Sequence, residues 1–331
     1  MDLKLIIQEL FYMEGVKTVK NKILSVLMTF TALFSLTACQ SNTDNEPDKL
    51  QIVTTIFPQY DFVRNIAGDN AEVTLLLTPG AESHAYEPTA ADISRIQQAD
   101  LFIYNGGTSE VWVEKILDST GRNDKNSLCL FDYIAPVESQ HEHHEHDEAG
   151  EHEHDEETDE HIFTSLRNSA QMLDVINERI CEIDAENASL YKQNSDKYKS
   201  EIIALDEEFS KMTSEAKRNI VVLGDRFPFT YFAQDYNLDC HAAFSGCSHD
   251  TEASPAVVSE LIETVQKNDI PIVFHIEFSD QKIAQKIADA TGAEIELLHS
   301  CHNISKDDFE NNVTYLQLMK NNYSILSEAL N

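Results

Sequence analysis

Five side chains that can bind a metal ion lie in loops where candidate strands and helices of this sequence meet. They are His84, His161, Asp225, His275 and His299. Neutral imidazole is the commonest metal ligand in proteins, and zinc takes nitrogen donors in tetrahedral geometry. A single His in a loop is more often a surface residue or a helix cap, so none of them is decisive alone. Their recurrence near strand ends in both halves of the chain indicates a metal site built from several loops.

A second group of histidines lies in one short acidic tract. Residues 138–160 contain twelve acidic residues and six His, with no Lys or Arg. These His are His141, His143, His144, His146, His152 and His154. The tract cannot bury apolar surface, which predicts a mobile loop, and its imidazole and carboxylate groups are donors that metals use. We interpret it as an auxiliary loop that gathers metal weakly, at several positions.

The composition limits the classes of partner. The chain has 331 residues, with 24 Lys and Arg against 58 Asp and Glu, and a formal net charge of −34. Hydrophobic residues make up 42%, enough for a folded core, and the length suggests two domains. Phosphate contacts need clustered Lys and Arg, so we expect no nucleic-acid binding, whereas a negative surface attracts cations.

Strands and helices alternate along the chain, with one interruption. In the first half we expect strands at 50–54, 73–77, 101–104 and 128–131, and helices at 60–67, 89–98 and 109–117. In the second half we expect strands at 220–223, 272–275 and 295–298, and helices at 230–235, 256–267, 281–290 and 307–330. Between them, residues 190–212 carry apolar residues at helical spacing without Gly or Pro.

This pattern predicts an α/β fold of two lobes with parallel sheets. The N-terminal lobe is expected over 49–188, one long rigid linking helix over 189–217, and the C-terminal lobe over 218–331. Open α/β sheets bind ligands outside the carboxyl ends of their strands. The metal site is therefore expected in the cleft between the lobes.

The N-terminus has the pattern of an export signal. Basic residues precede an apolar run over 23–36, which ends in Leu36-Thr-Ala-Cys39. Leu-Thr-Ala-Cys resembles a lipobox, so we expect residues 1–38 to be a lipoprotein signal peptide and Cys39 to carry the lipid. Met13 is an alternative start, and residues 39–48 are expected to form a flexible tether. Cys240 and Cys247 are close enough in sequence to pair, or to remain buried thiols.

Taken together, these motifs resemble the zinc and manganese class of solute-binding proteins of ABC importers, in its zinc-uptake branch. The most specific stretches are Gly80-Ala-Glu-Ser-His-Ala-Tyr-Glu-Pro-Thr89 and Glu160-His-Ile-Phe-Thr-Ser165, with the His-rich insertion between them. The resemblance covers essentially the whole chain after the signal. It implies two α/β lobes, a rigid linking helix and a metal buried between the lobes.

The resemblance also implies a ligand set. His84 and His161 match the two His ligands of the N-terminal lobe, and His299 takes the place where the family commonly has Asp. The family's further donor is missing before Phe229, where Asp225 stands beside Arg226, a cation that would repel the metal. The fourth ligand is therefore Asp225, His275 or a water. We interpret His302 as a helix cap, Cys301 as a buried thiol and His241 as a surface or packing residue.

The resemblance implies capture of Zn²⁺ outside the cytoplasmic membrane and its delivery to an ABC permease by a monomeric, lipid-anchored protein. Three or more His favour zinc over Mn²⁺, which prefers oxygen donors. The alternatives are a carrier of manganese or another divalent metal, an extracellular metal-buffering or adhesive lipoprotein, and a secreted zinc hydrolase. The last is least favoured because the sequence has no HExxH motif, so we expect no enzymatic activity.

Overall fold

The N-terminal half forms a parallel four-stranded sheet. The computed structural model describes residues 49–82, 86–123, 125–137, 158–246 and 253–331. Strands β1 (Leu50–Thr54), β2 (Ala71–Leu75), β3 (Leu101–Tyr104) and β4 (Ser127–Cys129) are ordered β2-β1-β3-β4. All three pairings are parallel, with Ile52 opposite Val73 and Leu101. Strand β2 lies on one side of β1 and strand β3 on the other, so the strand order reverses between β1 and β3. Open α/β sheets bind ligands at such a point.

Helices cover both faces of this sheet because its residues alternate between them. Val53 and Phe102 face α3 (Ala90–Gln98) and α4 (Trp112–Thr120), whereas Ile52 and Ile103 face the larger core with α2 (Phe57–Ala67). Helix α3 begins at the predicted cap. Thr89 accepts a hydrogen bond from the Asp92 backbone, and the Asp92 side chain accepts one from the Thr89 backbone.

The C-terminal half repeats this topology. Strands β5 (Ile220–Phe227), β6 (Asp239–Ser245), β7 (Ile272–His275) and β8 (Glu294–Leu297) are ordered β6-β5-β7-β8, and all pair in parallel. Helices α8 (Pro255–Lys267) and α9 (Lys282–Thr291) pack on one face through Val222 and Val273. Helices α7 (Thr230–Tyr236), α10 (Lys306–Glu310) and α11 (Tyr315–Leu330) complete this half.

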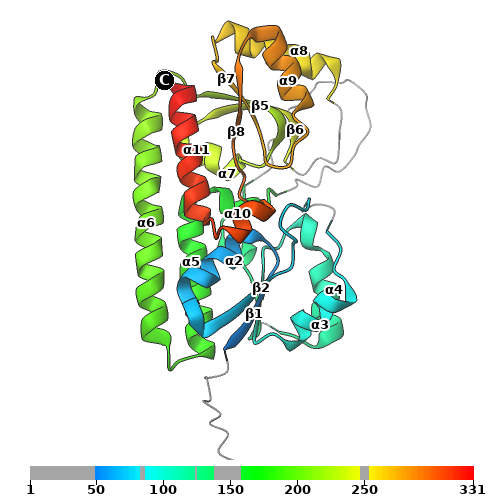
Figure 1. Ribbon diagram of the computed structural model, residues 1–331, viewed down its shortest axis with the longest axis vertical. Coiled ribbons are helices and arrows are strands. Elements are labelled where there is room, and N and C mark those ends of the chain that lie inside the picture. The colour runs from blue at the N-terminus through cyan, green and yellow to red at the C-terminus, as the bar shows by residue number, and fades with distance from the viewer. Residues whose placement is uncertain (1–48, 83–85, 124, 138–157, 247–252) are drawn as a thin grey trace, which may run out of the picture. The chain divides into compact units, whose positions relative to one another are not determined.

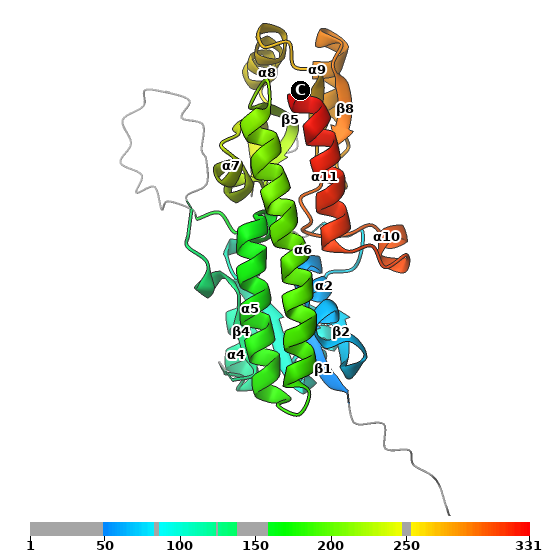
Figure 2. The ribbon, with the colours of Figure 1, turned by 90° about the vertical axis from the view of Figure 1, so that its left-hand side faces the viewer.

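A long helix joins the two halves (Figure 1). Helix α6 (Ala188–Glu215) follows α5 (Leu166–Ile183), contacts α2 of the first half, and contacts α7 and α11 of the second. Figure 2 shows α5, α6 and α11 side by side, with α6 spanning both sheets. Its buried residues include Tyr191, Tyr198, Ile202, Leu205 and Phe209, on one helical face. One buried core therefore runs through both halves, and residues 49–331 form one unit.

The predicted bounds differ from the observed ones by a few residues at several elements, including β2 and α4, and two larger differences concern β6 and the last helix. Strand β6 was missed because its sequence, Asp-Cys-His-Ala-Ala-Phe-Ser, alternates weakly and lies at a sheet edge with most residues only half-buried. The predicted closing helix over 307–330 is two helices. Asn312 has a left-handed φ of 55°, and Thr314 starts α11 through a capping box with Gln317.

Short 3₁₀ turns join the remaining elements: Gly68–Asn70, Thr108–Glu110, Phe131–Tyr133 and Ile162–Thr164. Among the residues that the structure describes, no helix combines the length and the apolar character needed to cross a membrane. Cys39, Cys247, His84 and the six His of the acidic tract lie outside the described residues.

Candidate metal centre

A small cavity lies where loops of both halves meet at the carboxyl ends of the two sheets. Its volume is about 30 Å³, roughly the space of one water molecule. His161 lines it from the first half, and Glu277 and His302 line it from the second. Ala81, Glu82, Arg226, Pro228, Gly246, Ile276, Phe278, Ser300 and Asn303 complete the lining.

His161 is fixed by a carboxylate two residues earlier. Its side chain is buried, and its Nδ1 lies 2.8 Å from Oδ1 of Asp159, which also accepts the backbone N–H of His161 at 2.8 Å. Thr230 Oγ1 donates to the other oxygen of Asp159 at 2.6 Å. A carboxylate in this place requires the proton on Nδ1 of the imidazole, which directs metal binding to Nε2.

The two groups stabilise each other's charged forms. Burial alone would raise the pKa of Asp159, but the attraction of His161 and the hydrogen bonds from His161 and Thr230 lower it. Burial alone would lower the pKa of His161, but the Asp159 carboxylate raises it, with Glu160 and Glu277 adding to the effect. The ionised Asp159 carboxylate therefore stabilises positive charge on the His161 ring, whether from a proton or from a bound metal ion.

His302 faces His161 from the loop after β8. The two rings are nearly perpendicular, at 85°, with centroids 5.5 Å apart. Phe163 packs against both imidazoles, at 6.0 Å from the His161 ring and 5.0 Å from the His302 ring. The loop is anchored on the first half, because Asn303 Nδ2 donates to the carbonyls of Thr78 and Ala81. Ser305, rather than His302, caps α10, so the predicted capping role of His302 is wrong.

Glu277 brings a carboxylate to the same cavity. Its oxygens accept hydrogen bonds from the backbone N–H of Ser300 at 2.8 Å and from the Ser300 hydroxyl at 2.5 Å. His299 lies behind it, with Nδ1 3.7 Å from Oε2 of Glu277. These contacts link the loop after β7 to the loop after β8.

The other predicted ligands in the described part of the chain do not line the cavity. Nδ1 of His299 accepts the backbone N–H of Cys301 at 2.9 Å, and Asp225 accepts the backbone N–H groups of Arg226 and Ile276 at 2.8 and 3.4 Å. His275 Nδ1 lies 2.8 Å from the carbonyl oxygen of Ile276. Cys301 is the buried thiol that the sequence predicts, and His241 lies 3.4 Å from Asp239.

Neither Glu277 nor His302 is among the ligands predicted from the sequence. Glu277 follows β7 by two residues, and that position alone was the signal available for it. Within the described ranges, no three His, Cys, Asp or Glu side chains are grouped closely enough to hold one metal ion. His84 lies outside those ranges, although Ala81 and Glu82, just before it, line the cavity.

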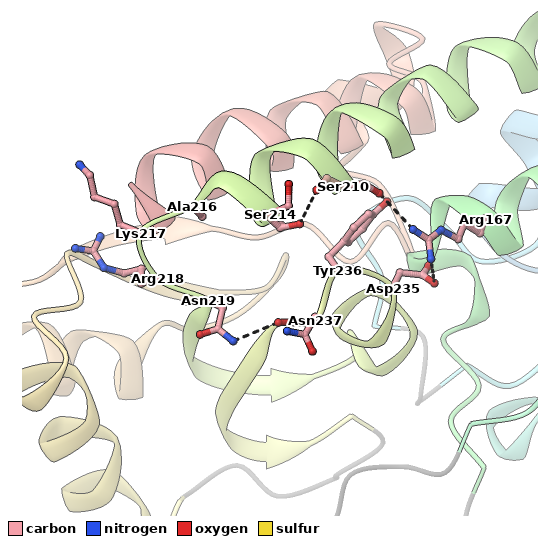
Figure 3. Close-up of a pocket in the computed structure, with 11 residues that line it drawn as sticks. Arg167, Ser210, Ser214, Ala216, Lys217, Arg218, Asn219, Asp235, Tyr236 and Asn237 are labelled. Carbon is pink, nitrogen blue, oxygen red and sulfur yellow. Dashed lines mark hydrogen bonds and ion pairs between the residues drawn. The ribbon is translucent and has the colours of Figure 1, made fainter.

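A larger cavity of about 560 Å³ lies elsewhere, among α6, α7 and the start of β5 (Figure 3). Lys217 and Arg218 line it and donate to the carbonyls of Asn331 and Ala329 at the end of α11. Cations at a helix C-terminus offset the negative end of the helix dipole. None of the predicted metal ligands lines this cavity, which lies where the end of α6 meets the end of α11.

Comparison with known proteins adds the family. The model of the family described as "Zinc-uptake complex component A periplasmic" (ZnuA) matches residues 52–329. The "Zinc-binding lipoprotein AdcA" of Streptococcus pneumoniae serotype 4 is 32% identical over 310 residues, which are 93% of this chain and 61% of that protein. The chain thus spans about three fifths of the length of that relative.

A relative of similar length is the "High-affinity zinc uptake system protein ZnuA" of Bacillus subtilis. It is 30% identical over 312 residues, covering 92% of this chain and 97% of that protein. The crystal structure of the Zn(II)-bound ZnuA-like domain of S. pneumoniae AdcA matches with a TM-score of 0.71 at 28% identity, covering 85% of this chain and 99% of that one. The metal-dependent lipoprotein YcdH of B. subtilis matches with a TM-score of 0.72 at 27% identity, covering 86% and 100%.

Proposed function

This chain belongs to the zinc-uptake complex component A family, and we propose that it captures Zn²⁺ outside the cytoplasmic membrane and delivers it to an ABC permease. The names of the S. pneumoniae and B. subtilis relatives, a zinc-binding lipoprotein and a zinc uptake protein, support zinc as its cargo. The lipobox-like Leu36-Thr-Ala-Cys39 supports a lipid anchor at Cys39. We infer a binding protein without catalytic turnover, acting as a monomer.

The observation that carries this proposal is the pair of buried imidazoles between the two sheets. Zinc binds imidazole nitrogen at about 2.0–2.1 Å in tetrahedral geometry, which sets two rings on one ion with centroids about 5 Å apart. The His161 and His302 rings are 5.5 Å apart. We propose them as ligands, with His84, from the sequence argument, as a third imidazole. Glu277 lines the same cavity, but both its oxygens accept hydrogen bonds from Ser300, so we assign it the negative charge beside the ion rather than a place among the ligands.

The remaining predicted ligands are left out of this set for physical reasons. Both carboxylate oxygens of Asp225 accept hydrogen bonds from backbone N–H groups at the ends of β5 and β7. His275 contacts the neighbouring carbonyl oxygen, and His299 lies behind Glu277. A set of three imidazoles favours zinc over Mn²⁺, whose preferred donors are oxygens.

The test is zinc titration of residues 39–331 and of single substitutions, with a chromophoric chelator as competitor. We expect His161→Ala and His302→Ala each to weaken zinc binding by more than about 100-fold, because loss of an outer-shell partner alone costs 10–100-fold. Glu277→Gln should weaken it as well. His275→Ala is the matched control and should bind zinc like the unaltered protein.

Uptake is tested in cells that lack the chromosomal gene. The unaltered chain should restore growth under zinc limitation, and the His161→Ala chain should not. Growth restored equally by both chains would favour a metal-buffering lipoprotein over a permease-coupled carrier. If His275→Ala loses zinc while His302→Ala keeps it, the ligand set proposed above is wrong.

A further inference from the structure

The segment that carries His161 is held by a helix of the opposite half. Helix α7 follows β5, yet it contacts residues 159–167 at several points. Thr230 Oγ1 donates to Oδ2 of Asp159 at 2.6 Å, and the Tyr231 hydroxyl donates to the Asp159 carbonyl at 2.9 Å. Further along, the Ser165 hydroxyl donates to Oδ2 of Asp235 at 2.5 Å.

We propose that Thr230 is a positioning residue for zinc, acting on His161 through the Asp159 carboxylate. This inference rests on the proposed function, in which His161 is a ligand. Because of this relay, the strength with which His161 of the N-terminal half binds zinc depends on the position of α7 in the C-terminal half.

The geometry of Asp159 is the first argument. One oxygen accepts both the backbone N–H and the Nδ1–H of His161, and the other accepts the Thr230 hydroxyl. The three side chains are buried, with exposures of 1% for His161 and 2% for Asp159 and Thr230. Because water cannot replace a lost partner there, removing the hydroxyl leaves one carboxylate oxygen without its donor. The carboxylate then turns, and the imidazole loses its fixed direction.

The remaining charged contacts between α7 and the residues that follow His161 are more exposed to water. Arg167 forms ion pairs with Asp235 at 3.3 Å and with Asp206 at 3.2 Å. Its guanidinium carbon also lies 5.7 Å from the centroid of the Tyr236 ring of α7 (Figure 3). The Arg167 side chain is 49% exposed, so its ion pairs are screened by water and contribute little. The buried hydrogen bonds of Thr230 and Tyr231 to Asp159 therefore hold α7 at the point nearest to His161.

The third argument is that the two proposed imidazole ligands are anchored crosswise. His161, from the first half, is held through Asp159 by α7 of the second half. His302, from the second half, lies in a loop whose Asn303 is held by the carbonyls of Thr78 and Ala81 in the first half. A movement of α7 away from Asp159 would therefore leave the His161 ring without its fixed orientation. Zinc could then be released without a movement of the two lobes apart.

The experiment measures zinc affinity by chelator competition for Thr230→Val, Thr230→Ser and Ser165→Ala, with the Co²⁺ absorption spectrum as a second readout. Thr230→Val should weaken zinc binding by about 10–100-fold, the range for loss of an outer-shell partner. Its Co²⁺ spectrum should change, because the direction of one ligand changes. Thr230→Ser keeps the hydroxyl and should restore both.

Ser165→Ala is the matched control, because it removes a contact with the same helix, together with the N-cap of α5, and neither contact involves Asp159 or the His161 side chain. It should lower the melting temperature of the metal-free protein while leaving zinc affinity unchanged. Equal zinc affinity for Thr230→Val and the unaltered protein overturns the proposal. An equally large loss of zinc affinity in Ser165→Ala and in Thr230→Val also overturns the proposal. General loosening of the contacts between α7 and residues 159–167 would then explain both losses.

Two further variants keep the test decisive. If Thr230→Val does not fold, Asp159→Asn keeps the shape of the side chain and should show the same loss of affinity. Zinc binding by Asp159→Asn at the unaltered affinity overturns the relay. His161→Ala separates the two levels of inference: if it still binds zinc tightly, the proposed ligand set fails, whereas a loss in His161→Ala without one in Thr230→Val contradicts the relay alone.

Discussion

At the residue scale, the cation at the rim of the cavity is offset by a partner from the other half. Arg226, which the sequence analysis expected to repel a metal, is paired bidentately with Glu82 at 3.1 and 3.2 Å. Side-chain exposures of 22% and 42% place the pair in contact with water. Its direct contribution to stability is therefore small, but it neutralises a charge beside the proposed zinc site.

We expect Glu82→Gln to weaken zinc binding by about 2–5-fold at low ionic strength, the size of a partly screened charge interaction. The effect should shrink as salt is added, because salt screens exposed charges. The measurement is zinc affinity at low and high NaCl concentration. Glu82→Gln combined with Arg226→Gln removes both charges and should bind zinc like the unaltered protein; a double variant as weak as the single one would contradict the charge argument.

At the element scale, three helices meet on one buried carboxyl group. Asp61 of α2 accepts a hydrogen bond from the Tyr198 hydroxyl of α6 at 2.6 Å and from the Tyr315 backbone N–H of α11 at 3.1 Å. Burial raises the pKa of Asp61 to about 6, against the lowering effect of Tyr198, Tyr315 and Arg64. The junction that aligns the linking helix with both halves therefore prefers the protonated acid.

This preference predicts how stability depends on pH. The pKa of Asp61 rises from 3.8 to about 6 on folding, so the folded protein binds this proton more tightly. The free energy of unfolding should therefore fall as pH rises from about 4 to about 6, by up to about 3 kcal/mol from this group. Asp61→Asn should remove that part of the slope. The measurement is urea unfolding of both proteins between pH 4 and pH 7.

Asp184, between α5 and α6, is the control of opposite sign. Hydrogen bonds from Tyr191 and Asn187 lower its pKa, so its contribution to stability is present at neutral pH and is lost as pH falls. Asp184→Asn should reduce stability at neutral pH and lose less stability on acidification. Identical pH profiles for Asp61→Asn and the unaltered protein would contradict the role assigned to Asp61.

At the scale of the whole molecule, the residues on either side of 138–157 meet at one point. The loop predicted over 138–160 is too long at its end, because Asp159 and Glu160 are buried and hydrogen-bonded. The Asp159 backbone N–H donates to the Val137 carbonyl at 2.9 Å. The Tyr231 hydroxyl accepts the Val137 N–H at 3.3 Å and donates to the Asp159 carbonyl. The tract can therefore be replaced by a short linker without moving His161.

We expect replacement of residues 138–157 by a short Gly-Ser linker to remove weak zinc binding at several sites while one tight site remains. The physical reason is that the proposed ligands His161 and His302 lie outside the tract, whereas its imidazoles lack a common rigid frame. Calorimetric titration of both proteins with zinc gives the number of sites and their affinities. Loss of the tight site with the tract would place specific binding in the tract instead.

The alternation of strands and helices predicted the two parallel sheets and the long linking helix, because hydrophobic periodicity is local along the chain. It missed β6, whose position at a sheet edge weakens that alternation, and the break near Asn312. At the site, the sequence indicated His161 because its neighbours carry a recognisable motif. Local patterns have no access to side-chain direction, so they did not distinguish His299 from His302.

The sequence by itself thus determined the fold class and the family, since residue types and their spacing carry these. Only the tertiary structure decided which donors share a cavity. Loops distant in the chain, at His161, Glu277 and His302, converge there because both sheets direct the carboxyl ends of their strands to one interface. Packing within the second half turned Asp225 to the backbone at the ends of β5 and β7, and packing between the two halves placed Thr230 on Asp159.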